Sequence, residues 1–229
     1  MTSSTRRCTP SSERASRPNS KFRVRAIKKN PDALTAFRRD CGRRLAAAIP
    51  AGDPRPIRVF SQDERRFGLL TIRRRRLTAR GVPPVGIIQH VFQSFYLYGA
   101  VAPTSGERFF LESPALNADQ FQRFLDAFSQ AFAASLNILV LDTSGAHTAR
   151  RLTIPENVRL VFLPPYCPEL NPIERVWRDL KDELAWREFA DLAALQAAVT
   201  RLLDAYDDPT VQSLTGAAYL VDAVHALCS

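Results

Sequence analysis

The stretch LVFLPPYCPELNPIERVWRDLKDEL, residues Leu160–Leu184, decides how the rest of the chain is interpreted. It opens as an apolar strand, which the pair Pro164-Pro165 must end because proline offers no N–H to a strand ladder. A helix is predicted next: Asn171 is a good N-cap, Pro172 suits the first helical position, and Glu174 falls at N3, where a capping box places a carboxylate. Apolar residues then recur at helical spacing, so one face of this helix is expected to be buried.

Taken alone, Glu174 is explained as a helix cap. In context, however, the run LPPYCPELNPIERVWRDLK closely resembles the third-carboxylate block of DDE transposases, in the insertion-sequence branch related to mariner elements. That resemblance implies that Glu174 is a metal ligand and that two aspartates stand upstream, each at the end of a strand. FSQDERRFGLL supplies Asp63 and ILVLDTSGAH supplies Asp142, and both surroundings resemble the family's first and second carboxylate blocks. Asp142 and Glu174 are 32 positions apart, within the family's usual range.

The resemblance implies an RNase H-like α/β fold, a mixed β-sheet flanked by helices, acting as the catalytic domain of a DNA transposase. It also implies two Mg²⁺ (or Mn²⁺) ions held by Asp63, Asp142 and Glu174. Two such ions, roughly 3.5–4 Å apart, activate an attacking hydroxyl and stabilise the leaving oxygen, so water can cut a strand and the freed 3′-hydroxyl can attack a second DNA. We therefore expect the three carboxyl groups to converge to within roughly 8 Å.

Departures from the family pattern leave other functions open. Thr143 stands where the family commonly has Asn, and Cys167 where it commonly has Ser, but neither change removes a ligand. Family members carry helix-turn-helix modules before the first aspartate, and 62 residues precede Asp63 here. We expect either the catalytic frame of a split element, working with a separate helix-turn-helix subunit, or a truncated relic. The rival functions are another RNase H-like nuclease and a non-catalytic DNA-binding remnant.

Charge is divided unevenly between the two parts of this chain of 229 residues. Met1–Arg80 carries 22 Lys and Arg against 6 Asp and Glu, whereas Gly81–Ser229 carries 10 against 17. A basic segment of this kind suits a polyanion, and DNA is the expected partner, bound by a homodimer. The alternative is a solvated tail that has no partner.

Candidate DNA contacts are the basic residues near the predicted carboxylates. They are Arg73, Arg74, Arg75, Arg76, Arg80, Arg178 and Lys181. For the arginine cluster, the alternative is an edge strand whose charges prevent aggregation.

Three further residues near the carboxylates have weaker signals. His147 is a candidate for contact with a metal-bound water or the scissile phosphate, as the matching family histidine is, or it is an ordinary surface-loop histidine. Glu64 points to the opposite strand face from Asp63, so a structural role is preferred. Trp177 is assigned to the core.

Two regions are expected: residues 1–56 as a basic, partly disordered arm or linker, and residues 57–229 as the catalytic domain with C-terminal helices. The predicted strands are Ile57–Asp63, Phe67–Arg73, Pro84–Phe92, Phe95–Val101, Glu107–Glu112, Asn137–Leu141 and Val158–Leu163. The predicted helices are Pro31–Ala48, Ala118–Ser135, the helix from Asn171 to Leu184, Phe189–Tyr206 and Val211–Leu227.

Composition is that of a globular chain. Hydrophobic residues make up 45%, mean hydropathy is −0.17, and no apolar run reaches the ~18 residues that a membrane helix needs. The four cysteines show no C-x-x-C spacing and are expected to be free thiols. We therefore expect a soluble protein with no membrane partner, in the bacterial cytoplasm and associated with the nucleoid.

Overall fold

A single mixed sheet of five strands forms the centre of the protein, whose structure is a computed structural model that describes residues 31–74, 79–81, 86 and 88–228. The strands are β1 (Ile57–Gly68), β2 (Ser94–Val101), β3 (Arg108–Ser113), β4 (Leu136–Leu141) and β5 (Val158–Phe162), in the order β3-β2-β1-β4-β5. The β1–β2 and β2–β3 pairs are antiparallel, whereas β1–β4 and β4–β5 are parallel. The predicted mixed sheet is therefore present.

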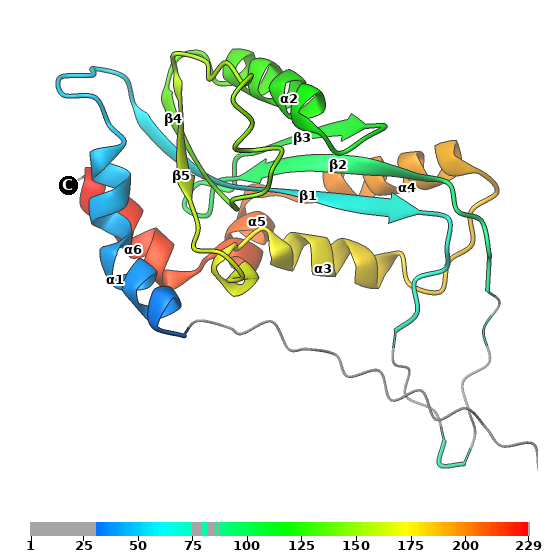
Figure 1. Cartoon of the computed structure of the whole chain (residues 1–229). Helices are drawn as coiled ribbons and strands as arrows, with labels where there is room; N and C mark the ends of the chain where they lie inside the picture. Colours follow the sequence, from blue (N-terminus) through cyan, green and yellow to red (C-terminus); the bar gives the residue numbers. More distant parts are fainter. Residues whose placement is uncertain (1–30, 75–78, 82–85, 87, 229) are drawn as a thin grey trace, which may run out of the picture.

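Helices cover both faces of this sheet (Figure 1). On one face lies α2 (Ala118–Ala131), whose phenylalanines pack against alternate residues of the strands. On the other face, α3 (Glu174–Glu183), α4 (Leu192–Asp204) and α5 (Asp208–Thr215) cover β1 and β2. The remaining pair, α1 (Pro31–Ala47) and α6 (Ala218–Cys228), covers β4 and β5 on that same face.

The register between β1 and β4 sets the positions of the first two predicted carboxylates. The parallel ladder pairs Ile57 with Leu136 and ends with Ser61 opposite Val140. Asp63 and Asp142 each lie two residues beyond this last pair, at the same end of the ladder. All six residues of β4 are buried, as the continuous apolar run predicts for a central strand.

Four predicted elements differ from those observed. Ile57–Asp63 and Phe67–Arg73 are not two strands, because β1 continues to Gly68 while pairing with β2, and it ends there. Residues 88–92 of the predicted strand Pro84–Phe92 lie in a connection without strand structure, and most of its remaining residues lie outside the described part of the chain. The predicted last helix is two helices, because α5 ends at Thr215 with Gly216 as its C-cap and α6 begins at Ala218.

The folded unit begins earlier than the predicted boundary between residues 56 and 57. Phe37, Cys41 and Leu45 of α1 are buried against α6 and the sheet. The amphipathic spacing of these residues predicts the helix correctly, but the basic residues around it suggested an arm. Residues 1–30 lie outside the described part of the chain, so the predicted disorder there stays a prediction.

We predict that α1 contributes to the stability of the catalytic domain. Leu45 has an exposed fraction of 0%, so Leu45→Ala should leave a cavity and lower the free energy of unfolding by about 2–5 kcal/mol. Leu116, which is 49% exposed, provides the control, and Leu116→Ala should change it by less than about 0.5 kcal/mol. Urea unfolding measures both, and equal small effects would show that α1 is not part of the cooperative unit.

Candidate active site

The three predicted carboxylates line one cavity of about 370 Å³. Asp63 comes from the middle of β1, Asp142 follows the last residue of β4, and Glu174 is the first residue of α3. The connection from β5 to α3 also lines the cavity, with Pro164, Pro165, Tyr166 and Cys167. All three therefore reach one cavity at the carboxyl ends of the parallel strands, whereas their approach to within roughly 8 Å stays a prediction.

Asp63 is held by a tryptophan from the helix above it. The indole Nε1 of Trp177 donates a hydrogen bond of 2.9 Å to Oδ2 of Asp63. Gly99 pairs with Asp63 on β2, and a Cβ there would lie 2.6 Å from the Trp177 ring. The glycine thus makes room for the indole. Trp177 is fully buried, so its assignment to the core is confirmed, and it also orients a site carboxylate.

The charged form of Asp63 is disfavoured in this setting. Burial, followed by repulsion from Glu64 and Glu174, raises the pKa of the Asp63 carboxyl from its ordinary value of 3.8 to about 8. The hydrogen bond from Trp177 opposes the increase without cancelling it. A cation in the cavity would remove this penalty, so the electrostatics of the site suit a bound metal ion.

Asp142 is tied to the loop that follows β4. The backbone N–H of Ser144 donates to its Oδ1 at 3.0 Å, and Nδ1 of His147 lies 2.8 Å from the same oxygen. These contacts, with that of His147 first, hold the pKa of Asp142 below its ordinary value. The carboxylate therefore stays ionised although half of it is shielded from solvent.

His147 is not a surface-loop histidine, since its side chain is 0% exposed. Its Nε2 lies 2.7 Å from Oε1 of Glu64, so the ring bridges two carboxylates. Burial alone would lower the pKa of His147, but the hydrogen bonds to Asp142 and Glu64 outweigh it and raise the pKa to about 10. The predicted contact with phosphate does not suit a ring enclosed in this way. Glu64 does face away from Asp63, as strand alternation predicts.

Glu174 is the first residue of α3 and not its third, as the capping box predicts, and Asn171 does not cap the helix with its side chain. The Asn171 amide instead donates to the backbone carbonyl of Gln62 at 2.8 Å, which ties the start of α3 to β1. Glu174 faces Arg65, whose Nη1 lies 3.5 Å from Oε2 of Glu174. The sequence reasoning missed Arg65. Its position, two residues after Asp63 on the same strand face, was the signal available.

The donor set suits a hard divalent ion, although the side chains are not arranged around one. Among the described residues, no three His, Cys, Asp or Glu side chains are grouped so that they hold a metal ion. Each predicted ligand instead contacts a protein partner: Trp177 for Asp63, His147 for Asp142 and Arg65 for Glu174. Carboxylate oxygens around one cavity, one of them destabilised by its neighbours, fit Mg²⁺ or Mn²⁺ chemically. Binding would require Glu174 to turn away from Arg65.

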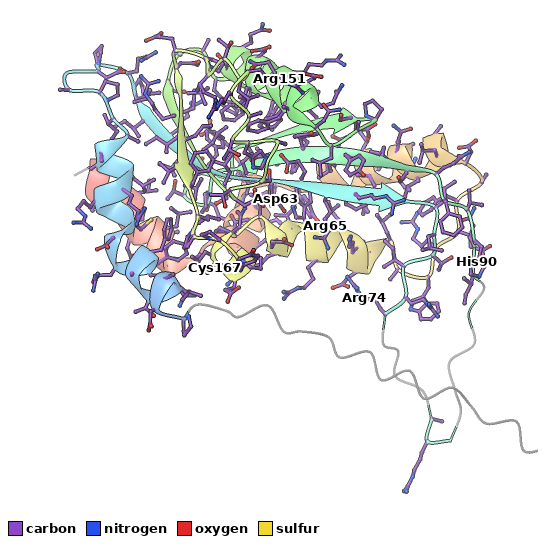
Figure 2. All side chains as sticks on the ribbon, in the orientation of Figure 1. Asp63, Arg65, Arg74, His90, Arg151 and Cys167 are labelled. Carbon is purple, nitrogen blue, oxygen red and sulfur yellow. The ribbon has the colours of Figure 1, made fainter. Side chains whose placement is uncertain are left out.

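Figure 2 shows Arg74, one of the predicted DNA contacts, near the C-terminal end of α3. Arg73, Arg80 and Arg178 are exposed, whereas Arg75 and Arg76 lie outside the described residues. Arg74 forms an ion pair with Asp182 of α3. No strand forms at the described part of the arginine cluster, so the alternative of a charged edge strand is wrong there.

Lys181 is near enough to Arg65, Arg74 and Glu174 for their charges to act on its ammonium group. Burial, followed by the nearby charges of Arg65 and Arg74, lowers the pKa of Lys181 to about 8. A cation crowded by two others is stabilised by an anion, and a DNA phosphate is one that would serve. Arg65, Arg74 and Lys181 therefore form a basic strip, the name used below for these three residues.

Comparison with known sequences identifies the family. The family described as DDE superfamily endonuclease matches residues 58–196, which is more than half of the chain. The chain belongs to this family. An uncharacterized protein of Sinorhizobium fredii, y4pE/y4sA, is 37% identical over 98 residues, covering 42% of this chain and 73% of that protein.

Solved structures with the same fold come from the Mos1 transposase. A pre-cleavage Mos1 transpososome matches with a TM-score of 0.61 and 16% identity, covering 87% of this chain and 62% of that chain. The mariner Mos1 paired-end complex with Mg also gives a TM-score of 0.61 and 16% identity, covering 88% and 63%. The predicted RNase H-like fold is thus confirmed, and this chain spans less than two thirds of each Mos1 chain.

Two expectations from composition bear on the described residues. The helices observed there are all too short or too polar to cross a membrane. Cys41 and Cys167 are both buried, and burial raises the pKa of the Cys41 thiol to about 11.

The raised pKa of Asp63 predicts how stability depends on pH without metal. Because the folded pKa lies above the unfolded one, the contribution of Asp63 to stability is lost as pH rises from about 4 through about 8. Asp63→Asn keeps an acceptor for Trp177 and has no charge to bury. In chelator at pH 8, its melting temperature should exceed that of the native chain, by roughly 2–4 °C per kcal/mol relieved.

Asp222, an exposed residue of α6, provides the control, and Asp222→Asn should leave the melting temperature unchanged at both ends of the pH range. The gain for Asp63→Asn should shrink as the pH falls towards 4. A variant less stable than the native chain at pH 8 would contradict the assigned electrostatics.

Proposed function

We propose that this chain is the catalytic domain of an insertion-sequence transposase, which cuts DNA strands and joins the freed 3′-hydroxyl to a second DNA. One observation carries the proposal: Asp63, Asp142 and Glu174, predicted from three separate sequence blocks, line the same cavity. Family membership supports endonuclease chemistry. The Mos1 structures of similar fold are transposase complexes, which supports transposition as the biological use of that chemistry.

In this proposal the three carboxylates hold two Mg²⁺ or Mn²⁺ ions. When bound, such ions activate the attacking hydroxyl and stabilise the leaving oxygen of an in-line displacement. Support comes from the raised pKa of Asp63 and from Mos1 complexes described as containing Mg and Mn. Other residues of the chain hold these carboxylates in place. Trp177 orients Asp63, and Arg65 pairs with Glu174 until a metal ion takes the place of Arg65.

DNA would approach along the basic strip. Arg65 and Lys181 lie beside Glu174, and Arg74 continues the strip along α3. Exposed Arg73, Arg80 and Arg178 would add phosphate contacts, as would Arg75, Arg76 and the basic N-terminal residues. Phosphate contacts position DNA without reading its sequence. We therefore also propose a separate helix-turn-helix subunit that reads the transposon ends.

Two further features belong to the proposal. A homodimer would hold the two ends of an element together, and the exposed apolar side chains of Ile88 and Phe92, 40% and 77% exposed, offer a surface for a second copy. The place of action would be the bacterial cytoplasm, at the nucleoid, where the DNA substrate is found.

The catalytic role predicts a separation between cutting and binding. Asp142→Asn should abolish Mg²⁺-dependent nicking of duplex DNA and leave DNA affinity within about 2-fold, because affinity comes mainly from basic residues. Asp222→Asn on α6 is the matched control and should nick normally. Nicking at the native rate by Asp142→Asn would refute the assignment, and cleavage of RNA–DNA hybrid alone would favour another RNase H-like nuclease.

The charge distribution predicts binding with little sequence preference. Residues 1–30 contain nine Lys and Arg against one Glu, and removing them leaves the whole described domain intact. Each phosphate contact adds about −0.9 to the slope of log affinity against log salt, so the truncated chain should show a shallower slope. Titration of terminal-repeat and random duplexes at several salt concentrations measures this. An unchanged slope, or tight repeat-specific binding by the intact chain, would show that the DNA-binding surface lies elsewhere.

A further inference from the structure

We infer that Glu64 and His147 form a positioning pair that fixes which oxygen of Asp142 faces the cavity. The inference rests on the proposed role of Asp142 as a metal ligand. Glu64, for which a structural role was preferred, thereby gains a function. His147 gains a role other than the predicted contact with phosphate.

The side chains of His147 and Glu64 are both buried in the core. The His147 ring packs against Phe121 of α2, with 4.4 Å between the ring centroids, and its side chain is 0% exposed. Glu64 is 7% exposed and accepts a second hydrogen bond, from Nε2 of Gln62 at 2.8 Å. Both members of the pair are therefore held by buried surroundings rather than by the mobile surface.

The Glu64–His147 pair contacts the carboxylate of Asp142, which solvent would otherwise leave free to rotate. The Asp142 side chain is 58% exposed, yet Nδ1 of His147 lies 2.8 Å from its Oδ1. The backbone N–H of Ser144 donates to the same oxygen. Because both contacts end on Oδ1, the carboxylate is fixed with Oδ2 turned away from them, and Oδ2 is the oxygen available to a ligand in the cavity.

The chemistry of the pair favours positioning over simple space filling. An apolar side chain could pack against Phe121 without the desolvation cost of buried charge. Only a histidine presents ring N–H groups in two directions, so it can link Glu64 to Asp142. The link also joins the two strands that carry the first two carboxylates, since Glu64 follows Asp63 on β1. Partners of this kind commonly change metal affinity by about 10–100-fold.

Two substitutions at one position separate the two halves of the link. In His147→Asn, the amide nitrogen takes the place of Nδ1, so the contact with Asp142 is retained and that with Glu64 is lost. In His147→Gln, the amide nitrogen takes the place of Nε2, so the contact with Glu64 is retained and that with Asp142 is lost. A purely structural histidine would not distinguish these two amides.

The experiment measures Mn²⁺ binding to the full chain without DNA, by electron paramagnetic resonance of the free ion, alongside thermal unfolding in chelator. His147→Gln should weaken Mn²⁺ binding by about 10–100-fold, and His147→Asn should weaken it by clearly less. Glu64→Gln, which keeps an acceptor and removes the charge, should lose about 10-fold. Equal Mn²⁺ affinities of folded His147→Gln and His147→Asn would overturn the inference.

Two controls complete the test. If His147→Gln does not fold, Glu64→Gln decides, because native Mn²⁺ affinity in that variant would overturn the pair and a clear loss would support it. Asp142→Asn reports on the metal site itself. Saturable Mn²⁺ binding that Asp142→Asn leaves unchanged would refute the proposed ligand role and the positioning with it, whereas failure of DNA joining alone would leave both intact.

Discussion

The parallel register between β1 and β4 is the constraint on which the site depends. The last pair of the ladder is Ser61 with Val140, so Asp63 and Asp142 each lie two residues beyond it at the same end, although 79 positions separate them in the chain. A slip of one residue would turn Asp63 to the α2 face and bury Glu64 beneath α3. The buried strand β4 and the alternating apolar residues of β1 hold this register, so the same packing that builds the core also places the carboxylates.

The site brings several carboxylates together, and each of them has a protein partner that offsets part of the repulsion. Trp177 donates to Asp63, His147 bridges Asp142 and Glu64, and Arg65 faces Glu174. The compensation is incomplete, since the pKa of Asp63 remains raised to about 8. Net repulsion among carboxylates is costly in a partly buried site, and a divalent cation bound as proposed would relieve it. The carboxylates that lower the stability of the metal-free protein are thus the ones that would favour metal binding.

Much of this arrangement follows from local sequence, and some of it does not. The apolar run before Asp142 and the proline-rich block before Glu174 predict their strand and helix start, because burial and proline chemistry act locally. The sequence pattern does not predict the full length of β1, because Glu64, Arg65 and Arg66 interrupt its apolar residues. Glu64 and Arg65 instead contact residues of the site, His147 and Glu174. The Asn171 amide was expected to cap α3 and instead joins β1, a tertiary contact that spacing along the chain does not encode. The bridge formed by His147 was missed for the same reason.

The central claim, that these three carboxylates together bind catalytic metal, is tested most directly by anomalous diffraction from crystals of the chain soaked in Mn²⁺. The account predicts anomalous density in the cavity within about 2.0–2.3 Å of oxygens of Asp63, Asp142 and Glu174, with Glu174 rotated away from Arg65. Density bound elsewhere, or an empty cavity with the Arg65–Glu174 pair intact at saturating Mn²⁺, would contradict it.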